Sequence, residues 1–243
     1  SFIRAMRQML DQKHPQDFPN PVVSRQACVC TPTCFVPIDR VRIIGERINP
    51  TGKKRLKQAI LEQDFDYILS QGLSQLEAGA QILDVNMGMP EVDESRMLPL
   101  VIQKLQGVLD APLQIDSSNV KAIEQALRLY NGKPIVNSVN GEEGSMNAIL
   151  PLVKKYGAAV VALTLDDNGI PLLAEERFAI AERIVAHAEQ YGIPREDIYV
   201  DCLTLTASVQ QKEVVETLKA MRMVKEQLGC CLLYTSPSPR DRS

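Results

Sequence analysis

Polar residues that could bind or activate a small molecule recur along this chain, and nearly all of them follow short apolar runs. They are acids and amides: a carboxylate accepts two hydrogen bonds at once, and an amide offers both polarities. Such side chains suit a ligand whose edge displays neighbouring N–H groups. The residues are Glu46, Asn49, Asp84, Asn86, Asp116, Asn137, Asn140, Asp166 and Asp201.

The two histidines do not belong to this set. His14 lies in a proline-rich stretch and His187 lies inside a helical pattern. Histidine-based acid/base or triad chemistry is therefore disfavoured. A heterocycle such as a pterin, which has an edge of neighbouring N–H groups, suits carboxylates paired with amides better.

The apolar runs are short enough to be strands buried on both faces, and helical patterns of a dozen or more residues separate them. Gly79, Gly132, Gly157 and Gly192 follow four of these patterns, as left-handed C-caps do. The predicted strands cover residues 41–45, 81–85, 113–115, 134–136, 159–165 and 198–200, and the predicted helices cover 64–78, 94–109, 120–130, 144–156, 174–191 and 209–228.

Alternating units of this kind predict a parallel sheet, either open or closed into a barrel. The first strand-to-helix turn, residues 45–52, carries no nucleotide-binding glycine pattern. Polar residues at nearly every strand end favour a barrel, because all strand ends of a barrel meet at one mouth. We expect a TIM-type (β/α)8 barrel of the α/β class, here about six βα units with an N-terminal linker.

Composition limits the partners and the location. The 243 residues, 45% of them hydrophobic, can bury one large core, and a net charge of -3 leaves no basic surface for nucleic acid or a membrane. No apolar run reaches the roughly 18 residues of a membrane span, and no signal peptide is recognisable. We expect a cytoplasmic protein. Cys28, Cys30 and Cys34 lack a fourth ligand nearby, so we predict no metal site.

Six segments in chain order carry a resemblance to a known family. They are IIGERINPTGKK (residues 43–54), GAQILDVNMG (79–88), QIDSSNVKAIEQAL (114–127), PIVNSVNGE (134–142), GAAVVALTLDDNGIP (157–171) and IPREDIYVDCL (193–203). Together they resemble the pterin-binding barrel of cobalamin-dependent methionine synthase and of the methyltetrahydrofolate:corrinoid protein methyltransferases. The resemblance runs over about residues 39–229.

The resemblance implies roles for seven residues at the barrel mouth. Asp116, Asn137 and Asp201 would bind the pterin edge and serve catalysis. Asp84 and Asn86 would line the mouth. Glu46 and Asn49 lie in the signature loop of the family.

The resemblance also implies the reaction. The N5 methyl group of 5-methyltetrahydrofolate would pass to cob(I)alamin, or another corrinoid, on a partner domain or protein. Because a tertiary amine leaves poorly, the protein must place proton or hydrogen-bond density on N5. In the family an asparagine on the seventh strand helps, and we expect this chain to stop before that strand.

The chain then divides into three predicted parts. Residues 1–38 would hold the end of a homocysteine-binding domain, with a helix over residues 2–10 that ends at Asp11, and a proline-rich linker. Residues 39–229 would form the incomplete pterin-binding barrel, and residues 230–243 an unstructured or spurious tail. Zinc would belong only to the part of the homocysteine-binding domain upstream of residue 1.

Several alternatives stay open. Asp116 could instead cap the helix after it, and Asn137 could bind loop backbone. Asp166 precedes Asn168-Gly169, for which we favour a plain turn. For the function, the alternatives are a dihydropteroate synthase-like condensation of a pterin pyrophosphate with an aromatic amine, and a folate-binding fragment without turnover.

Overall fold

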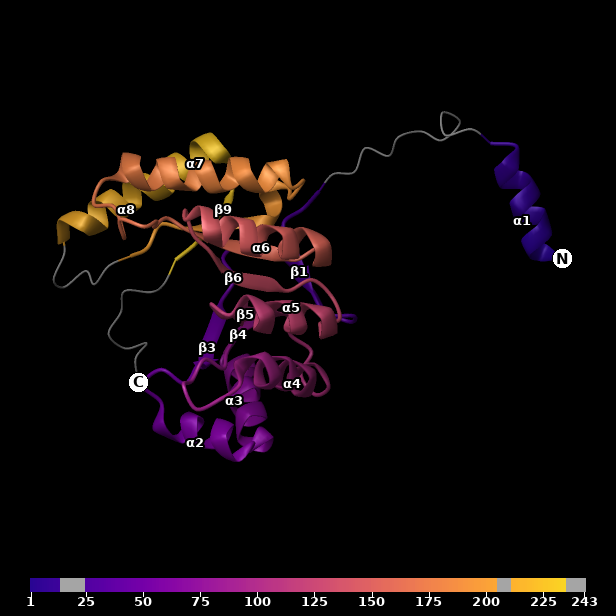
Figure 1. Cartoon of the computed structure of the whole chain (residues 1–243), viewed down its shortest axis with the longest axis horizontal. Helices are drawn as coiled ribbons and strands as arrows, with labels where there is room; N and C mark the ends of the chain where they lie inside the picture. Colours follow the sequence, from indigo (N-terminus) through magenta and orange to yellow (C-terminus); the bar gives the residue numbers. More distant parts are fainter. Residues whose placement is uncertain (14–24, 205–210, 235–243) are drawn as a thin grey trace.

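A computed structural model of the protein describes residues 1–13, 25–204 and 211–234 (Figure 1). Its centre is one seven-stranded parallel sheet in which the strands follow their order along the chain. The sheet is curled in the manner of a TIM barrel, which confirms the predicted fold class. The strands are β3 (Ile44–Ile48), β4 (Ile82–Asn86), β5 (Leu113–Asp116), β6 (Ile135–Val139), β7 (Ala159–Leu163), β8 (Ile198–Asp201) and β9 (Cys231–Leu233).

Helices alternate with these strands and pack beside one another in chain order (Figure 1). This alternation confirms the predicted strand-helix units. The helices are α2 (Lys54–Glu62), α3 (Phe65–Glu77), α4 (Glu94–Gln106), α5 (Val120–Leu129), α6 (Glu143–Tyr156), α7 (Ala174–Gln190), the short η2 (Arg195–Asp197), α8 (Gln211–Met223) and η3 (Val224–Leu228). The predicted helix near the N-terminus is α1 (Phe2–Asp11), which has no buried residue.

Local sequence signals set the helix ends. Asp64, Asp93 and Asn119 accept backbone N–H groups at the starts of α3, α4 and α5, as N-caps do. Gly79, Gly157 and Gly192, at the ends of α3, α6 and α7, have φ between 68° and 99°, so the predicted left-handed C-caps are confirmed there. For Gly132 the prediction is wrong, because α5 is capped by Tyr130 in an extended conformation and Gly132 follows two residues later with φ 123°. Several helix ends were therefore readable from the chain itself.

Side chains of the sheet pack into two separate apolar clusters. In β4, Leu83 and Val85 belong to the large cluster between the sheet and the helices, whereas Ile82 belongs to a smaller cluster on the inner face. Because successive side chains point to opposite faces of a strand, Asp84 and Asn86 share the inner face with Ile82. The inner face is thus apolar at the amino end of β4 and polar at its carboxyl end.

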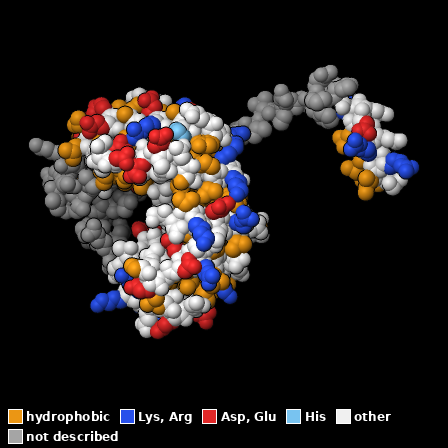
Figure 2. Space-filling view, viewed as in Figure 1, with side chains coloured by type: hydrophobic (Ala, Val, Ile, Leu, Met, Phe, Trp, Pro, Cys, Tyr) orange, Lys and Arg blue, Asp and Glu red, His pale blue; other side chains and the backbone are white. Residues whose placement is uncertain are grey.

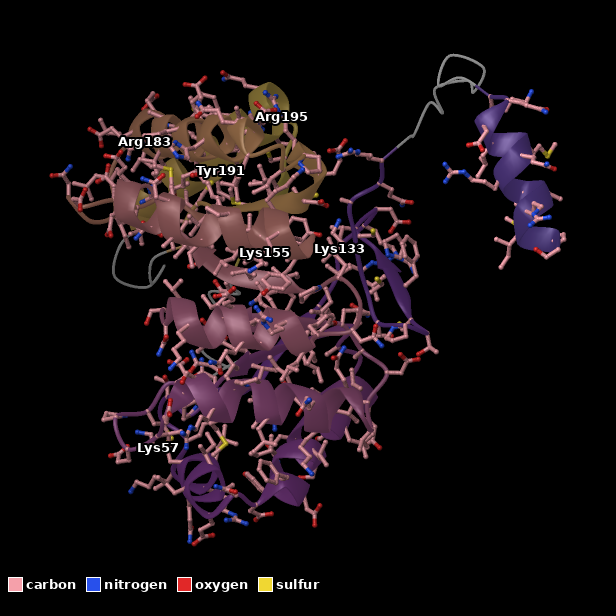
Figure 3. All side chains as sticks on the ribbon, turned by 45° about the vertical axis from the view of Figure 1, so that its right-hand side comes forward. Lys57, Lys133, Lys155, Arg183, Tyr191 and Arg195 are labelled. Atoms are coloured by element: carbon pink, nitrogen blue, oxygen red, sulfur yellow. The ribbon has the colours of Figure 1, made fainter. Side chains whose placement is uncertain are left out.

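A β-hairpin closes the apolar end of this inner face. It consists of β1 (Cys28–Cys30) and β2 (Phe35–Pro37), and Val29 and Val36 pack into the inner cluster. Cys30 exchanges backbone hydrogen bonds of 3.0 and 3.1 Å with Lys133, which Figure 3 labels beside the hairpin. A Cβ at Gly132 would lie 2.3 Å from the Cys30 carbonyl oxygen, so this approach needs glycine.

This hairpin changes the interpretation of the proline-rich stretch. The proline-rich composition predicts a linker over residues 28–37, whereas the structure packs them against the barrel. Strands of three residues carry too little alternation to be recognised. The division of the chain into domains stays a prediction, and residues 14–24 lie outside the described part.

Two predicted boundaries are wrong. The first strand begins at Ile44 rather than at residue 41, because Val41 and Ile43 stay exposed. Part of the predicted unstructured tail forms β9, which pairs in parallel with β8, and Leu232 of β9 packs against the large cluster. The rest of that tail, residues 235–243, lies outside the described residues.

The expectation that the chain stops before a seventh strand is therefore also wrong. No helical pattern follows this short apolar run, so the sequence did not mark it as a further unit. The strand and its flanking residues read Cys-Cys-Leu-Leu-Tyr over residues 230–234 and include no asparagine.

Candidate functional site

The carboxyl ends of three neighbouring strands bring predicted site residues into one row. The register of the sheet pairs Asn86 with Asp116, and Asp116 with Asn137. Asp84 lies one layer deeper, paired with Gln114. Residues two apart on a strand share a face, so all five side chains belong to the inner face. Figure 2 shows the molecule hollowed beside the strands, with acidic atoms near the hollow.

Amide groups hold the carboxylates of this row. Gln114 donates from Nε2 to Oδ1 of Asp84 at 2.6 Å, and Asn86 donates from Nδ2 to Oδ2 of Asp116 at 2.9 Å. The Asn86 Oδ1 accepts the backbone N–H of Gly88 at 2.8 Å, which orients its amide. Each acid is therefore held by an amide from the neighbouring strand.

Burial makes these acids hard to ionise. It raises the pKa of Asp84 well above its ordinary value, the negative charges of Asp116 and Glu46 raise it further, and the Gln114 and Asn137 amides lower it. Burial also raises the pKa of Asp116, against the hydrogen bond from Asn86. Because both pKa values are raised, the pair of acids favours a state in which the two carboxyl groups together keep one proton.

Asp201 extends the inner polar face beyond this row. It is 8% exposed, ends β8 and pairs in register with Leu163 of β7. Its Oδ1 accepts the N–H of Leu203 at 2.8 Å, and burial raises its pKa. Tyr199, two residues earlier, lies in the inner cluster, so Asp201 shares the face of Asn137 from two strands away.

The predicted signature loop starts from the edge strand β3. Glu46 is exposed within β3, and Asn49, directly after it, is buried. Asn49 makes a long 3.5 Å hydrogen bond to Glu46 and accepts the Thr51 N–H at 3.0 Å. Lys53 donates to the carbonyl oxygens of Glu46 and Asn49. The charge of Glu46 raises the pKa of Asp84, which ties this loop electrostatically to the row.

Other polar residues after the strands build turns. Asn140 accepts the N–H of Glu142 at 3.0 Å. Asp166 accepts the N–H of Asn168 at 3.0 Å and pairs with Arg183, labelled in Figure 3, at 2.9 Å. The favoured interpretation of Asp166 as a turn residue is thus confirmed.

Sequence reasoning missed Gln114 and Glu94. Gln114 stands in a predicted strand two residues before Asp116, so the period of two was a signal that it shares the face of that acid. Glu94, in the first turn of α4, raises the pKa of Asp116 by its charge, although no pattern in the chain linked the two.

The described part of the chain offers neither a metal site nor a membrane-spanning helix. Across residues 1–13, 25–204 and 211–234, no group of three or more His, Cys, Asp or Glu residues is placed to hold a metal ion. No helix in that part of the chain is long and apolar enough to cross a bilayer. Lysine and arginine mix with acids on the face shown in Figure 2.

A curled parallel α/β sheet with amide-held acids at its carboxyl edge defines a barrel-type ligand-binding domain. The family described as pterin binding enzyme matches residues 45–238. The chain belongs to this family of pterin-binding enzymes. The methionine synthases of Mycobacterium leprae and Mycobacterium tuberculosis are each 30% identical over 197 residues, which is 77% of this chain and 16% of each relative.

Solved structures of dihydropteroate synthases share the fold. The Xanthomonas albilineans enzyme in complex with indole-2-carboxylic acid and 6-chloroguanine has a TM-score of 0.66 at 20% identity, over 87% of this chain and 77% of that one. The same enzyme with 4-aminobenzoic acid has a TM-score of 0.64 at 23% identity, over 86% and 76%. At these identities the likeness concerns the fold alone.

Proposed function

We propose that the chain binds 5-methyltetrahydrofolate at the carboxyl ends of its strands and passes the N5 methyl group to cob(I)alamin or another corrinoid, as the folate-binding part of a methionine synthase-like methyltransferase. One observation carries this proposal. Asn86, Asp116 and Asn137 stand in one register above the buried Asp84. The family match and the identity to methionine synthases support it.

The proposed roles follow from the hydrogen-bonding capacity of each side chain. Asp116, Asn137 and Asp201 would bind the pterin edge, because two carboxylates and an amide can meet its N–H groups and its acceptors. Asp84 and Asn86 would line the mouth and hold Asp116 in place. Glu46 and Asn49 would border the ligand from β3.

Methyl transfer needs little covalent chemistry from the protein. The C–N5 bond breaks, its electron pair stays on N5, and N5 takes up a proton. The corrinoid, carried by another domain or protein, would supply the nucleophile. The residues of this chain would orient the methyl group and offer protonated or amide groups near N5, a role that suits an acid such as Asp84, whose pKa burial raises well above its ordinary value.

The partners belong to the proposal as well. The chain spans 16% of the length of the methionine synthases that it matches, so a corrinoid-binding domain over the mouth and an upstream homocysteine-binding domain are inferred. Zinc would belong to that upstream domain alone. A cytoplasmic location also stays a prediction.

Titration calorimetry with 5-methyltetrahydrofolate tests the proposal. We expect Asp201→Ala to weaken binding by about 10-fold to 100-fold, the range for losing a hydrogen bond to a charged group. Asp166→Ala is the matched control, because that acid follows the neighbouring strand β7 but is engaged in its own turn. If wild type and Asp201→Ala bind the folate with equal affinity, Asp201 does not bind the pterin edge and the proposed site is wrong.

Adding cob(I)alamin separates the remaining functions. Methyl transfer supports the methyltransferase, whereas binding without transfer supports a folate-binding chain without turnover. Product from a pterin pyrophosphate and an aromatic amine would instead support the dihydropteroate synthase-like alternative.

A further inference from the structure

Two buried oxygen atoms in the deep layer of the site have no hydrogen-bond donor. Asp84 is 2% exposed and Gln114 is 5% exposed, and they face each other across β4 and β5. In the part of the chain that the structure describes, neither Oδ2 of Asp84 nor Oε1 of Gln114 has a partner in hydrogen-bond geometry, although the amide of Asn137 lies near enough to Asp84 to lower its pKa. Such orphaned acceptors are uncommon because each costs about 1 to 3 kcal/mol.

The hydrogen bond between the two residues decides where a proton can reside. The Gln114 Nε2 occupies Oδ1 of Asp84 at 2.6 Å, so Oδ2 is the remaining oxygen. A proton there turns one orphaned acceptor into a donor and removes a buried charge. The charged groups that act on Asp84 are Asp116 from β5 and Glu46 from β3, and both oppose its ionisation.

We propose that Gln114 is a positioning residue that, by occupying Oδ1 of Asp84, directs the proton of this buried neutral acid to Oδ2, while Asp116 is the ionised acid that meets the N–H groups of the ligand. This inference deepens the proposed function and rests on it for the ligand. When the surroundings of two neighbouring acids keep one protonated and the other ionised, the two acids can perform different tasks. Here the deeper acid, farther from the strand ends, keeps the proton.

Gln114 has a second, measurable effect in this arrangement. Its amide stabilises the ionised form of Asp84, so it limits how far burial raises the pKa of that acid. Replacing the amide by an apolar group of similar size removes this donor. The pH at which Asp84 loses its proton must then rise, an effect that a purely structural role would not produce.

Infrared titration of the ligand-free chain, by the carboxylic C=O band, tests the inference. Because burial also raises the pKa values of Asp116 and Asp201, the signal of Asp84 is the part of the wild-type band that Asp84→Asn removes, and that part should persist above the ordinary range of aspartic acid. Gln114→Met should shift its midpoint upward by about one pH unit, the worth of one hydrogen bond to a charged group.

Gln75→Met is the matched control, because Gln75 is also 5% exposed but supports the backbone of β3 at Arg47. It should leave the midpoint in place. An unmoved midpoint in Gln114→Met, or a band that Asp84→Asn leaves entirely unchanged, would overturn the inference. Thermal melting of each variant confirms that it is folded.

Calorimetry with 5-methyltetrahydrofolate separates this inference from the proposed function. Gln114→Met should move the pH dependence of binding in the same direction as the infrared midpoint. If the wild type and every variant fail to bind the folate while the infrared midpoint still shifts, the function fails and the protonation assignment stands.

Discussion

The two ends of the inner face are built from the same strands but from opposite kinds of side chain. At the amino end, Val29 and Val36 of the hairpin pack against inner residues such as Ile82 and Ile135. At the carboxyl end, acids are buried against amides and against other acids. Removing apolar surface from water stabilises the fold at the amino end, whereas removing charge from water destabilises it at the carboxyl end.

This difference separates stability from function along single strands. In β4 the step from Ile82 to Asp84 is two residues, yet the environment changes from an apolar cluster to a group of acids. Barrel enzymes place ligand sites at the carboxyl ends of strands, whereas the opposite end serves stability. Substitutions at the two ends should therefore affect different measurements.

The largest expected effect is at the hairpin. Val29→Asp places an unpaired charge in the closed end, where Val29 is fully buried, and should lower the free energy of unfolding by about 3 to 5 kcal/mol. Urea denaturation measures this change. An unchanged midpoint would mean that the hairpin does not seal the barrel, and the contrast between the two ends would be lost.

The next effect is on binding. Asp116→Asn removes the acid in the middle of the row, and we expect 5-methyltetrahydrofolate to bind about 10-fold to 100-fold more weakly. Stability should change little or increase, because a buried charge is removed. Calorimetry and melting on the same sample check both parts, and a drop in stability without a change in affinity would reverse the interpretation.

A smaller effect concerns pH. Burial raises the pKa of Asp84, so the folded chain keeps this proton to higher pH than the unfolded chain does. The stability that this retained proton contributes is complete below the unfolded-state pKa of about 4, and it is lost as the pH rises through the folded-state pKa of Asp84. Asp84→Asn should therefore gain about 1 kcal/mol at neutral pH, and the gain should shrink on acidification.

Urea denaturation of wild type and Asp84→Asn over a range of pH compares the two curves directly. A constant difference at every pH would show that folding leaves the pKa of Asp84 unchanged, which contradicts the prediction.

The smallest effect returns to the closed end. Thr31 donates to Asp110 at 2.6 Å and ties the hairpin to the loop before β5. Thr31→Val should cost about 1 kcal/mol of stability and leave folate affinity unchanged. A change in affinity would show that the hairpin is coupled to the mouth.

Much of this architecture was predictable because its signals are local. Helix caps and the alternation of apolar runs with helical patterns depend on residues a few positions apart, so Asp64 and Gly79 could be interpreted alone. The hairpin and β9 were missed because three-residue strands carry almost no period. The first strand was placed too early because Val41 and Ile43 are apolar yet exposed.

The site was predictable in its residue types but not in its contacts. The sequence singled out Asp84, Asn86, Asp116 and Asn137, yet the partner of Asp84 is Gln114, 30 positions away. Nothing local marks such a pair, because the register between strands decides it.

By itself, the sequence determined the alternation of strands with helices, many helix ends and the acids and amides that follow the strands, since these depend on local patterns of a few residues. Only the tertiary structure decided which acids are neighbours, which amide holds each of them and how far they are removed from water. Register and desolvation depend on segments that are distant along the chain, and they set the pKa values on which the chemistry of the site would depend.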